Sequence, residues 1–326
     1  MKKSELDGIC VDASELVQLR LLAKDFHLSK ARASLRSLAG AHSSRARGRG
    51  MSFAEVRHYQ AGDDVRNIDW RVTARTQRTH TKLFEEEKER PVFVLLDQRK
   101  SMFFGSQVQF KSVLAARLAA LCCWQAYAGH DRIGSLIFND HSQCDLRPRQ
   151  GKKSSLQFIN HIVEYNQQLH QQNPQVQQAS SDTNTAFSLD TMLEEALRIA
   201  RPGSLIYLIS DFHDLSQSSE KSLALLARHN ELRFFHVSDP LEAHLPKLGS
   251  VNLSNGDEQI QVNLNSKRFQ KEYSHSWHQL NETIEALCLK YKITYHAFST
   301  AHRVNELIHS NLSPALEQSN TLKEAK

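Results

Sequence analysis

Two acidic residues of this chain each follow a run of apolar residues that is typical of a buried strand. Asp97 ends the run VFVLLD, and Asp211 follows the run LIYLIS. Hydroxyl groups occur at Ser101, shortly after the first run, and at Thr191, which opens the helical pattern TMLEEAL. Carboxylate and hydroxyl oxygens are hard ligands suited to Mg²⁺ or Mn²⁺. These residue types therefore predict an oxygen-lined cation site, provided that their loops converge.

Arg99 interrupts this pattern, because it stands between Asp97 and Ser101. A guanidinium cannot be deprotonated in proteins, so it brings a fixed positive charge toward the place of the cation. If it points inward, it pairs with Asp97 or Asp211 and takes the place of the metal. If it points outward, the remaining ligands and water still hold an ion weakly. The sequence leaves both alternatives open.

The elements that must position these residues alternate from Pro91 onward. Apolar runs typical of strands are VFVLLD, DRIGSLIFND, PGSLIYLISD, LRFFHVSD and ITYHAFST, and helical patterns lie between them. Such alternation predicts an α/β fold with a doubly wound, mostly parallel sheet and helices on both faces. Ligands of open α/β sheets bind beyond the carboxyl ends of the strands. We therefore expect Asp97 and Asp211 at one edge of a single sheet.

Changes in composition divide the chain into four parts. We expect an N-terminal helical arm and basic linker at 1–50, a small β-rich segment at 51–90, an α/β domain at 91–312 with a β-hairpin insertion at about 245–265, and a polar tail at 313–326. Leucines at helical spacing in residues 14–39 predict the helix of the arm.

Positive charge is concentrated near the N-terminus. Between Arg20 and Arg49 there are eight Lys or Arg residues and one acidic residue, Asp25. This basic segment could contact phosphates, grip an acidic partner or stay solvated. The run SSRARGRG at its end lacks interleaved aromatic residues that would stack on bases, so a solvated or partner-binding role is favoured over nucleic-acid binding.

A second charged segment is YQAGDDVRNIDW at 59–70. Asp63, Asp64 and Asp69, together with Arg57, Arg66 and Arg71, could form a recognition surface for a partner or an acidic metal cluster. Alternatively, Gly62 marks a turn in which Asp63 bonds back to the chain, and the other charges form a structural network.

The cysteines and the N-terminus bear on the cellular compartment. The five cysteines are odd in number and show no CxxC spacing, so we expect a reducing environment. The first residues lack the apolar core of a secretion signal, and no apolar run approaches the length of a bilayer span. These features predict a cytoplasmic protein without a membrane span.

The strand-end motifs together resemble those of von Willebrand factor A domains, whose metal-ion-dependent adhesion site combines D-x-S-x-S, T-x-L-x-x-A-L and a strand ending in S-D. This sequence matches with Asp97, Ser101, Thr191 and Asp211, and Arg99 replaces the first serine. The run RGRGMSFAEVRHYQAGDDVRNIDWRVTAR resembles the signature of the DUF58 family, as do HTKLFEEEKERP and DPLE. This resemblance implies a von Willebrand A-like fold and association with a MoxR-type AAA+ ATPase. It implies no known catalysis.

We therefore expect a non-enzymatic protein-binding or adaptor module that docks a partner through a degenerate adhesion-like site. A carboxylate of the partner would complete the coordination of Mg²⁺ or Mn²⁺, or would pair with Arg99 if no ion is present. One alternative is a magnesium-dependent phosphoesterase using Asp97 and Asp211, for which the sequence offers no evident general base or nucleophile. Another is nucleic-acid binding through the basic N-terminal segment.

Overall fold

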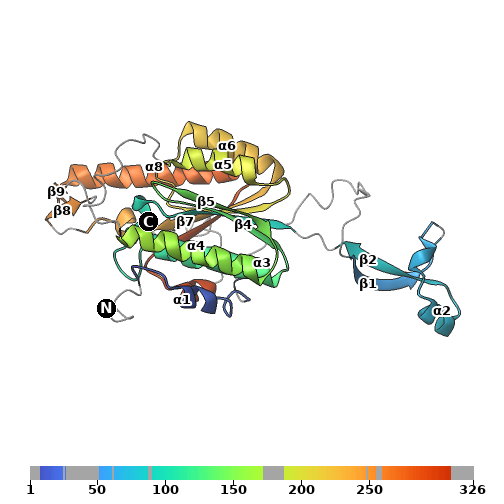
Figure 1. Ribbon diagram of the computed structural model, residues 1–326. Coiled ribbons are helices and arrows are strands. Elements are labelled where there is room, and N and C mark those ends of the chain that lie inside the picture. Colours follow the sequence, from blue (N-terminus) through green and yellow to red (C-terminus); the bar gives the residue numbers. More distant parts are fainter. Residues whose placement is uncertain are drawn as a thin grey trace. The chain divides into compact units, whose positions relative to one another are not determined.

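The computed structural model describes residues 8–24, 26, 51–60, 62–86, 90–171, 187–246, 249–254 and 259–309 (Figure 1). Two compact units make up the chain: Met1–Ala31 with Arg90–Lys326, and Arg32–Glu89. The basic linker expected before residue 51 and the polar tail expected at 313–326 lie outside the described residues.

The larger unit is a mixed α/β structure built on a six-stranded sheet with the order β10-β7-β6-β3-β4-β5. The strands are β3 (Pro91–Asp97), β4 (Arg132–Phe138), β5 (Gln143–Arg149), β6 (Leu205–Ser210), β7 (Glu231–Ser238) and β10 (Thr294–Ser299). All neighbouring strands are parallel except β4 and β5. From β3, later strands extend the sheet in both directions, so the strand order reverses between β3 and β6.

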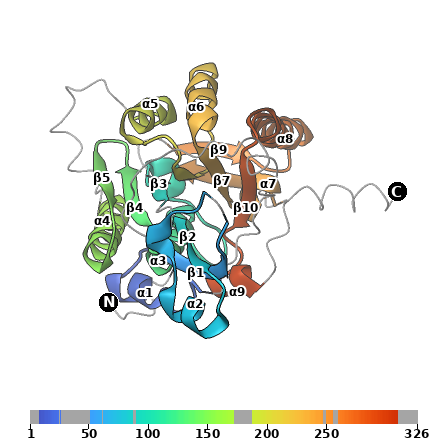
Figure 2. The same cartoon turned by 90° about the vertical axis from the view of Figure 1, so that its right-hand side faces the viewer.

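Helices cover both faces of this sheet, as Figures 1 and 2 show. One face carries α1 (Ala13–Gln18), α3 (Lys111–Ala128), α4 (Lys152–Gln171) and α9 (Val304–His309). The other carries α5 (Leu189–Ile199), α6 (Gln217–His229) and α8 (Lys267–Tyr291). Strands β3 and β6 are buried almost throughout because their side chains are apolar on both faces. None of the helices in the described ranges combines the length and apolar character needed to cross a bilayer.

The N-terminal segment packs on α3 and differs from the single helix predicted for residues 14–39. Helix α1 ends at Gln18, and hydrogen bonds such as Arg20 N to Val17 O tighten the following turns. This tightening lets buried Leu19, Ala23 and Phe26 join the same core as Leu16. The indole of Trp124 on α3 donates to Leu16 O at 2.8 Å. Residues 27–39 of the predicted helix lie outside the described residues.

Two parts of the larger unit add antiparallel pairs. Strand β5 has the polar sequence QCDLRPR and forms one edge of the sheet, where its side chains alternate between half-buried and exposed. The separate hairpin of β8 (Ser250–Ser254) and β9 (Gln259–Asn263) falls within the range where an insertion was expected. The predicted Asn-Gly turn of that hairpin lies outside the described residues.

The smaller unit is an antiparallel pair of β1 (Met51–His58) and β2 (His80–Glu86), joined by two short helices. These are the 3-10 helix η1 (Val65–Asn67) and α2 (Trp70–Thr76). Asp69 caps α2, since its side chain accepts hydrogen bonds from the backbone N–H groups of Arg71 and Val72.

Candidate functional site

Asp97 ends β3 and is fully buried, and Arg99 folds back onto it. The guanidinium donates from Nε to Asp97 Oδ1 at 3.0 Å and from Nη2 to Asp97 Oδ2 at 2.7 Å. Arg99 also donates its backbone N–H to Oδ1, and Ser210, at the end of β6, donates its hydroxyl to Oδ2 at 2.7 Å. Both oxygens of Asp97 are therefore occupied by donors from this chain.

The opposite side of the Arg99 guanidinium binds a second carboxylate, Asp214. Nη1 donates to Asp214 Oδ2 at 2.5 Å, and Nη2 donates to Oδ1 at 3.0 Å. Asp214 Oδ2 also accepts the backbone N–H of Leu189, the first residue of α5, at 2.9 Å. The guanidinium stacks over the Phe138 ring, 5.3 Å from its centroid. Arg99 thus points inward and bridges two carboxylates.

Lys111, the first residue of α3, is a second buried cation at this edge. Its Nζ donates to Asp211 Oδ2 at 2.9 Å and to Glu242 Oε1 at 2.6 Å. Glu242 belongs to the short helix α7 (Pro240–Ala243) after β7, and its Oε1 also lies 3.3 Å from His213 Nε2. The loops after β6 and β7 and the start of α3 therefore meet at one lysine.

We call these six side chains the rim cluster: Asp97, Arg99, Lys111, Asp211, Asp214 and Glu242. They lie at the end of β3 and in the connections that follow β3, β6 and β7, where parallel strands end and the strand order reverses. This is where open α/β sheets bind ligands.

Backbone packing and a further buried acid fix the loops of the rim cluster. Gly105 lies in the loop between Arg99 and α3, and a Cβ there would overlap Gln109 O and lie 2.7 Å from Phe110 Cα. Asp239 follows β7 and accepts hydrogen bonds from the Ser106 backbone and hydroxyl, from Thr300 Oγ1 and from Leu241 N. One carboxylate therefore joins the loops after β3, β7 and β10.

Burial and charge pairing together determine the pKa values of the rim cluster. Burial raises the pKa of Asp97, against the lowering effect of Arg99 and Ser210. Burial acts in the same direction on Asp211, but Lys111 and His213 lower its pKa to about 2. The pKa of Lys111 and that of Arg99 stay above their ordinary values, because neighbouring carboxylates outweigh the cost of burying each cation. Both cations therefore remain charged.

The two predicted hydroxyl ligands lie apart from these ion pairs. Ser101 is exposed in the 3-10 helix η2 (Lys100–Met102). Thr191 is exposed near the start of α5, where its N–H and hydroxyl contact the Ser188 hydroxyl. Within the described parts of the chain, neither hydroxyl is hydrogen-bonded to Asp97 or Asp211. The structure thus brings the two acids into one cluster and leaves the hydroxyls at its surface.

The acids of segment 59–70 have local roles in the smaller unit. Asp63 pairs with Arg57 at 2.7 Å and accepts the Gln60 N–H, which closes the turn at Gly62. Asp64 accepts the N–H of Arg66 at the start of η1. Asp69 caps α2 and lies 3.5 Å from Lys82. The carboxylates thus shape the loop.

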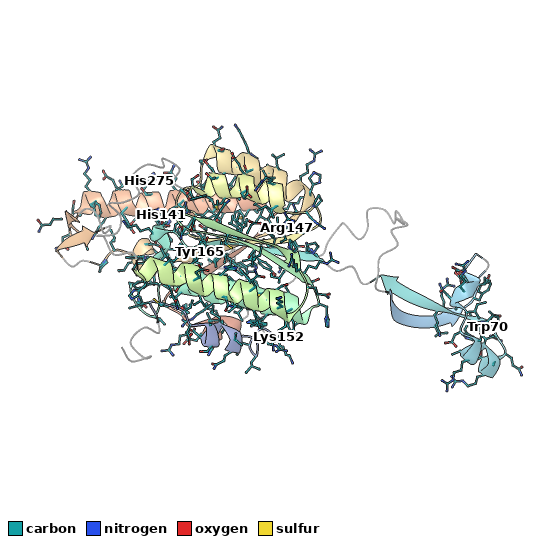
Figure 3. The ribbon with its side chains drawn as sticks, viewed as in Figure 1. Trp70, His141, Arg147, Lys152, Tyr165 and His275 are labelled. Atoms are coloured by element: carbon teal, nitrogen blue, oxygen red, sulfur yellow. The ribbon has the colours of Figure 1, made fainter. Side chains whose placement is uncertain are left out.

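The outer surface of this loop is instead basic and apolar. Trp70, labelled in Figure 3 on α2, is 70% exposed, and Val65 is 62% exposed. Arg66, Arg71 and Arg75 are also exposed, and none of them forms an ion pair with a described residue. Trp and Arg are the side chains most enriched at the energetic centres of protein interfaces.

Sequence reasoning did not identify Lys111, Asp214 or Glu242 as parts of the site. Asp214 had a local signal, because it follows Asp211 within the run SDFHDL at the same strand end. Glu242 closes the DPLE run, which is also a capping box for α7. Nothing in the sequence indicated that Lys111 belongs to the site, since a lysine at the start of an apolar helix is normally solvated.

Two of the buried acids in the rim cluster are each paired with a cation of the chain. Asp97 is held by Arg99 and Asp211 by Lys111, so donors of the chain already bind both carboxylates. His213 is an exposed titratable group beside the cluster, and hydrogen bonding to Glu242 raises its pKa. The partner of His213 is Glu242, whose Oε1 already accepts a hydrogen bond from Lys111.

Comparison with known proteins identifies a family and several relatives of this chain. The family model described as a protein of unknown function, DUF58, matches residues 55–283. The uncharacterised protein Rv1480 of Mycobacterium tuberculosis is 29% identical over 223 residues, which are 68% of this chain and 66% of that protein. The uncharacterised protein YeaD of Bacillus subtilis is 37% identical over 81 residues, 25% of this chain and 20% of that protein.

Among solved structures, a conserved hypothetical protein, BatB from Bacteroides thetaiotaomicron, superposes with a TM-score of 0.39 and 16% sequence identity. That match covers 72% of this chain and 99% of the other. The chain itself spans just under two thirds of the length of its mycobacterial relative.

Proposed function

This chain belongs to the DUF58 family, and from that premise we propose that it is a non-catalytic protein-binding module whose docking surface is the edge of the sheet that carries the rim cluster. The observation that carries the proposal is the pairing of Asp97 with Arg99 and of Asp211 with Lys111. These ion pairs hold the buried acids and cations in fixed positions. Ser101 and Thr191 are exposed on the segments that follow β3 and begin α5.

The finer assignment is a von Willebrand A-like domain. It is supported by the mixed sheet with helices on both faces and by the D-x-R-x-S, T-x-L-x-x-A-L and S-D motifs in the loops. The proposed partner is a MoxR-type AAA+ ATPase. That proposal rests on the resemblance of the DUF58 signature.

A divalent ion does not fit this site as its residues stand. Mg²⁺ or Mn²⁺ would need free carboxylate oxygens, and both oxygens of Asp97 are already occupied by Arg99 and Ser210. Lys111 places a second positive charge on Asp211. We therefore propose that docking is independent of metal.

The hydrolase alternative loses support for the same reason, because a two-carboxylate metal site requires Asp97 and Asp211 to be available to the ion. Turnover of a phosphate monoester with added Mg²⁺ would support it. Nucleic-acid binding rested on the basic N-terminal segment, most of which lies outside the described residues.

The test is direct binding between this purified chain and the purified MoxR-type ATPase of the same organism, measured by calorimetry with and without EDTA. Ser101→Arg and Thr191→Arg add bulk and charge at exposed positions of the proposed surface. Gln157→Arg is the control, because Gln157 is exposed on α4. We expect at least a tenfold loss of affinity in the first two variants, none in the control and no effect of EDTA. Equal affinities in all three variants would contradict the proposed surface.

A further inference from the structure

We propose that the outer side of the Arg99 guanidinium is a binding site for a carboxylate side chain of a partner protein, and that Asp214 occupies this site in the isolated chain. The inference rests on the proposed function for the identity of the partner. The sequence already suggested that a partner carboxylate pairs with Arg99, and the structure adds the internal residue that must leave, Asp214.

The two carboxylates on Arg99 are held very differently. Asp97 is fully buried and receives two donors from Arg99's side chain, one from its backbone and one from Ser210. The side chain of Asp214 is 36% exposed and is held by the guanidinium and by Leu189 N. Asp97 is thus a permanent part of the cluster, and Asp214 is the carboxylate with access to solvent.

If Asp214 left Arg99, another anion would have to replace it. Arg99 is only 7% exposed and keeps its charge, so losing Asp214 would leave a largely buried cation with two unsatisfied donors. An incoming carboxylate restores both bonds in the parallel geometry that a guanidinium favours. It also meets the N-terminus of α5, which favours negative charge. Exchange of one carboxylate for another keeps the number of hydrogen bonds, whereas a neutral or cationic group does not.

The guanidinium is held in place for such an exchange. Its Nε and Nη2 are hydrogen-bonded to Asp97, and its Cζ lies over the Phe138 ring. The recognised group is therefore an aspartate or glutamate side chain presented by the partner.

Chemical rescue tests this site without the partner. In Asp214→Ala, the outer donors of Arg99 lose their acceptor and a small space opens beside them. We expect the thermal midpoint of this variant to fall below that of wild type, and formate or acetate to raise it saturably beyond the effect of chloride at equal ionic strength. Wild type should respond equally to all three salts. The double variant Asp214→Ala/Arg99→Gln should lose the specific rescue.

Glu195→Ala is the matched control, because Glu195 forms a similar bidentate pair with Arg198, whose side chain is 76% exposed. Solvent already satisfies that arginine, so formate should give no specific rescue. If formate and chloride act alike on Asp214→Ala, the carboxylate site is refuted.

Should Asp214→Ala fail to fold, the isosteric Asp214→Asn carries the test through partner binding. It weakens the internal bond, and we expect its affinity for the purified ATPase to rise several-fold over wild type; unchanged or lower affinity would refute the proposal. The two proposals fail separately. Rescue by formate without any binding of the ATPase would support the carboxylate site and refute the docking function. Binding of the ATPase without rescue by formate would support the docking function and refute the carboxylate site.

Discussion

Lys111 and Asp211 form a 2.9 Å ion pair between side chains that are each 1% exposed. Buried lysines usually lose their proton, but here Asp211 and Glu242 share the same ammonium and keep it charged. Together with Arg99 on Asp97, this pair places fixed positive charge at the strand ends where the sequence predicted a cation site. Four measurements examine the consequences.

Removing Lys111 should strongly destabilise the larger unit. Lys111→Met leaves Asp211 and Glu242 buried without their shared cation, and breaking a buried pair costs about 3–5 kcal/mol. Guanidinium-induced unfolding at pH 7 measures this loss. Adding Asp211→Asn should recover part of it, because one uncompensated charge disappears. Lys152→Met at an exposed lysine is the control; an equally large effect there would show that the burial of Lys111 is not the cause.

Wild type should give no saturable heat with millimolar Mg²⁺ or Mn²⁺ in isothermal titration, because Arg99 and Ser210 occupy the oxygens of Asp97. Arg99→Ser frees Asp97 and Asp214 and restores the serine of the resembled motif. We expect this variant to bind Mn²⁺ with one site. Saturable binding by wild type would contradict the metal-independent site.

Acid should destabilise the protein through two buried histidines. Burial lowers the pKa of His236 and that of His296 from 6.5 to about 4. The unfolded chain therefore binds these protons first, and the stability that each neutral ring contributes is present above pH 6.5 and lost as the pH falls through about 4. The full shift corresponds to about 3 kcal/mol for each histidine. Asp211, with its pKa of about 2, contributes no loss in this window.

Denaturant unfolding at several pH values between 7 and 4 measures this slope. His296→Phe keeps a ring against Phe235 and should flatten it. His275→Asn, at an exposed histidine of α8 labelled in Figure 3, should leave it unchanged. A slope that is the same in both variants and in wild type would point to other groups.

Trp70→Ala tests the exposed surface of the smaller unit. Because the ring is 70% exposed, its loss should change the free energy of unfolding by less than about 0.5 kcal/mol. If this surface also contacts the partner, affinity for the purified ATPase should fall about tenfold. Asp69→Ala, which removes the α2 cap, should instead cost about 1 kcal/mol of stability. Unaltered binding by Trp70→Ala would exclude this surface from the contact.

The arrangement of strands and helices was largely predictable from the sequence. Apolar runs long enough to be buried on both faces mark β3 and β6, and their ends place Asp97 and Asp211 at the carboxyl ends of neighbouring strands. Strand β5 was not recognised, because its alternation of polar and half-buried residues and its Pro148 resemble a loop.

The pairing within the site was much less predictable. Whether Arg99 points inward depends on Asp214 and on Phe138, which lie at the ends of other strands. Lys111 is buried only because acids from the loops after β6 and β7 surround its ammonium. Such contacts depend on where distant loops meet, and residue spacing along one segment does not contain that information.

Strand β5, at one edge of the sheet, has a sequence that affects whether another strand can pair with it. It presents Asp145, Arg147 and Arg149 to solvent, and Pro148 removes one backbone donor. An incoming strand would have to bury those charges and forgo that hydrogen bond. Charged side chains and a proline are features that disfavour pairing of another strand along the β5 edge.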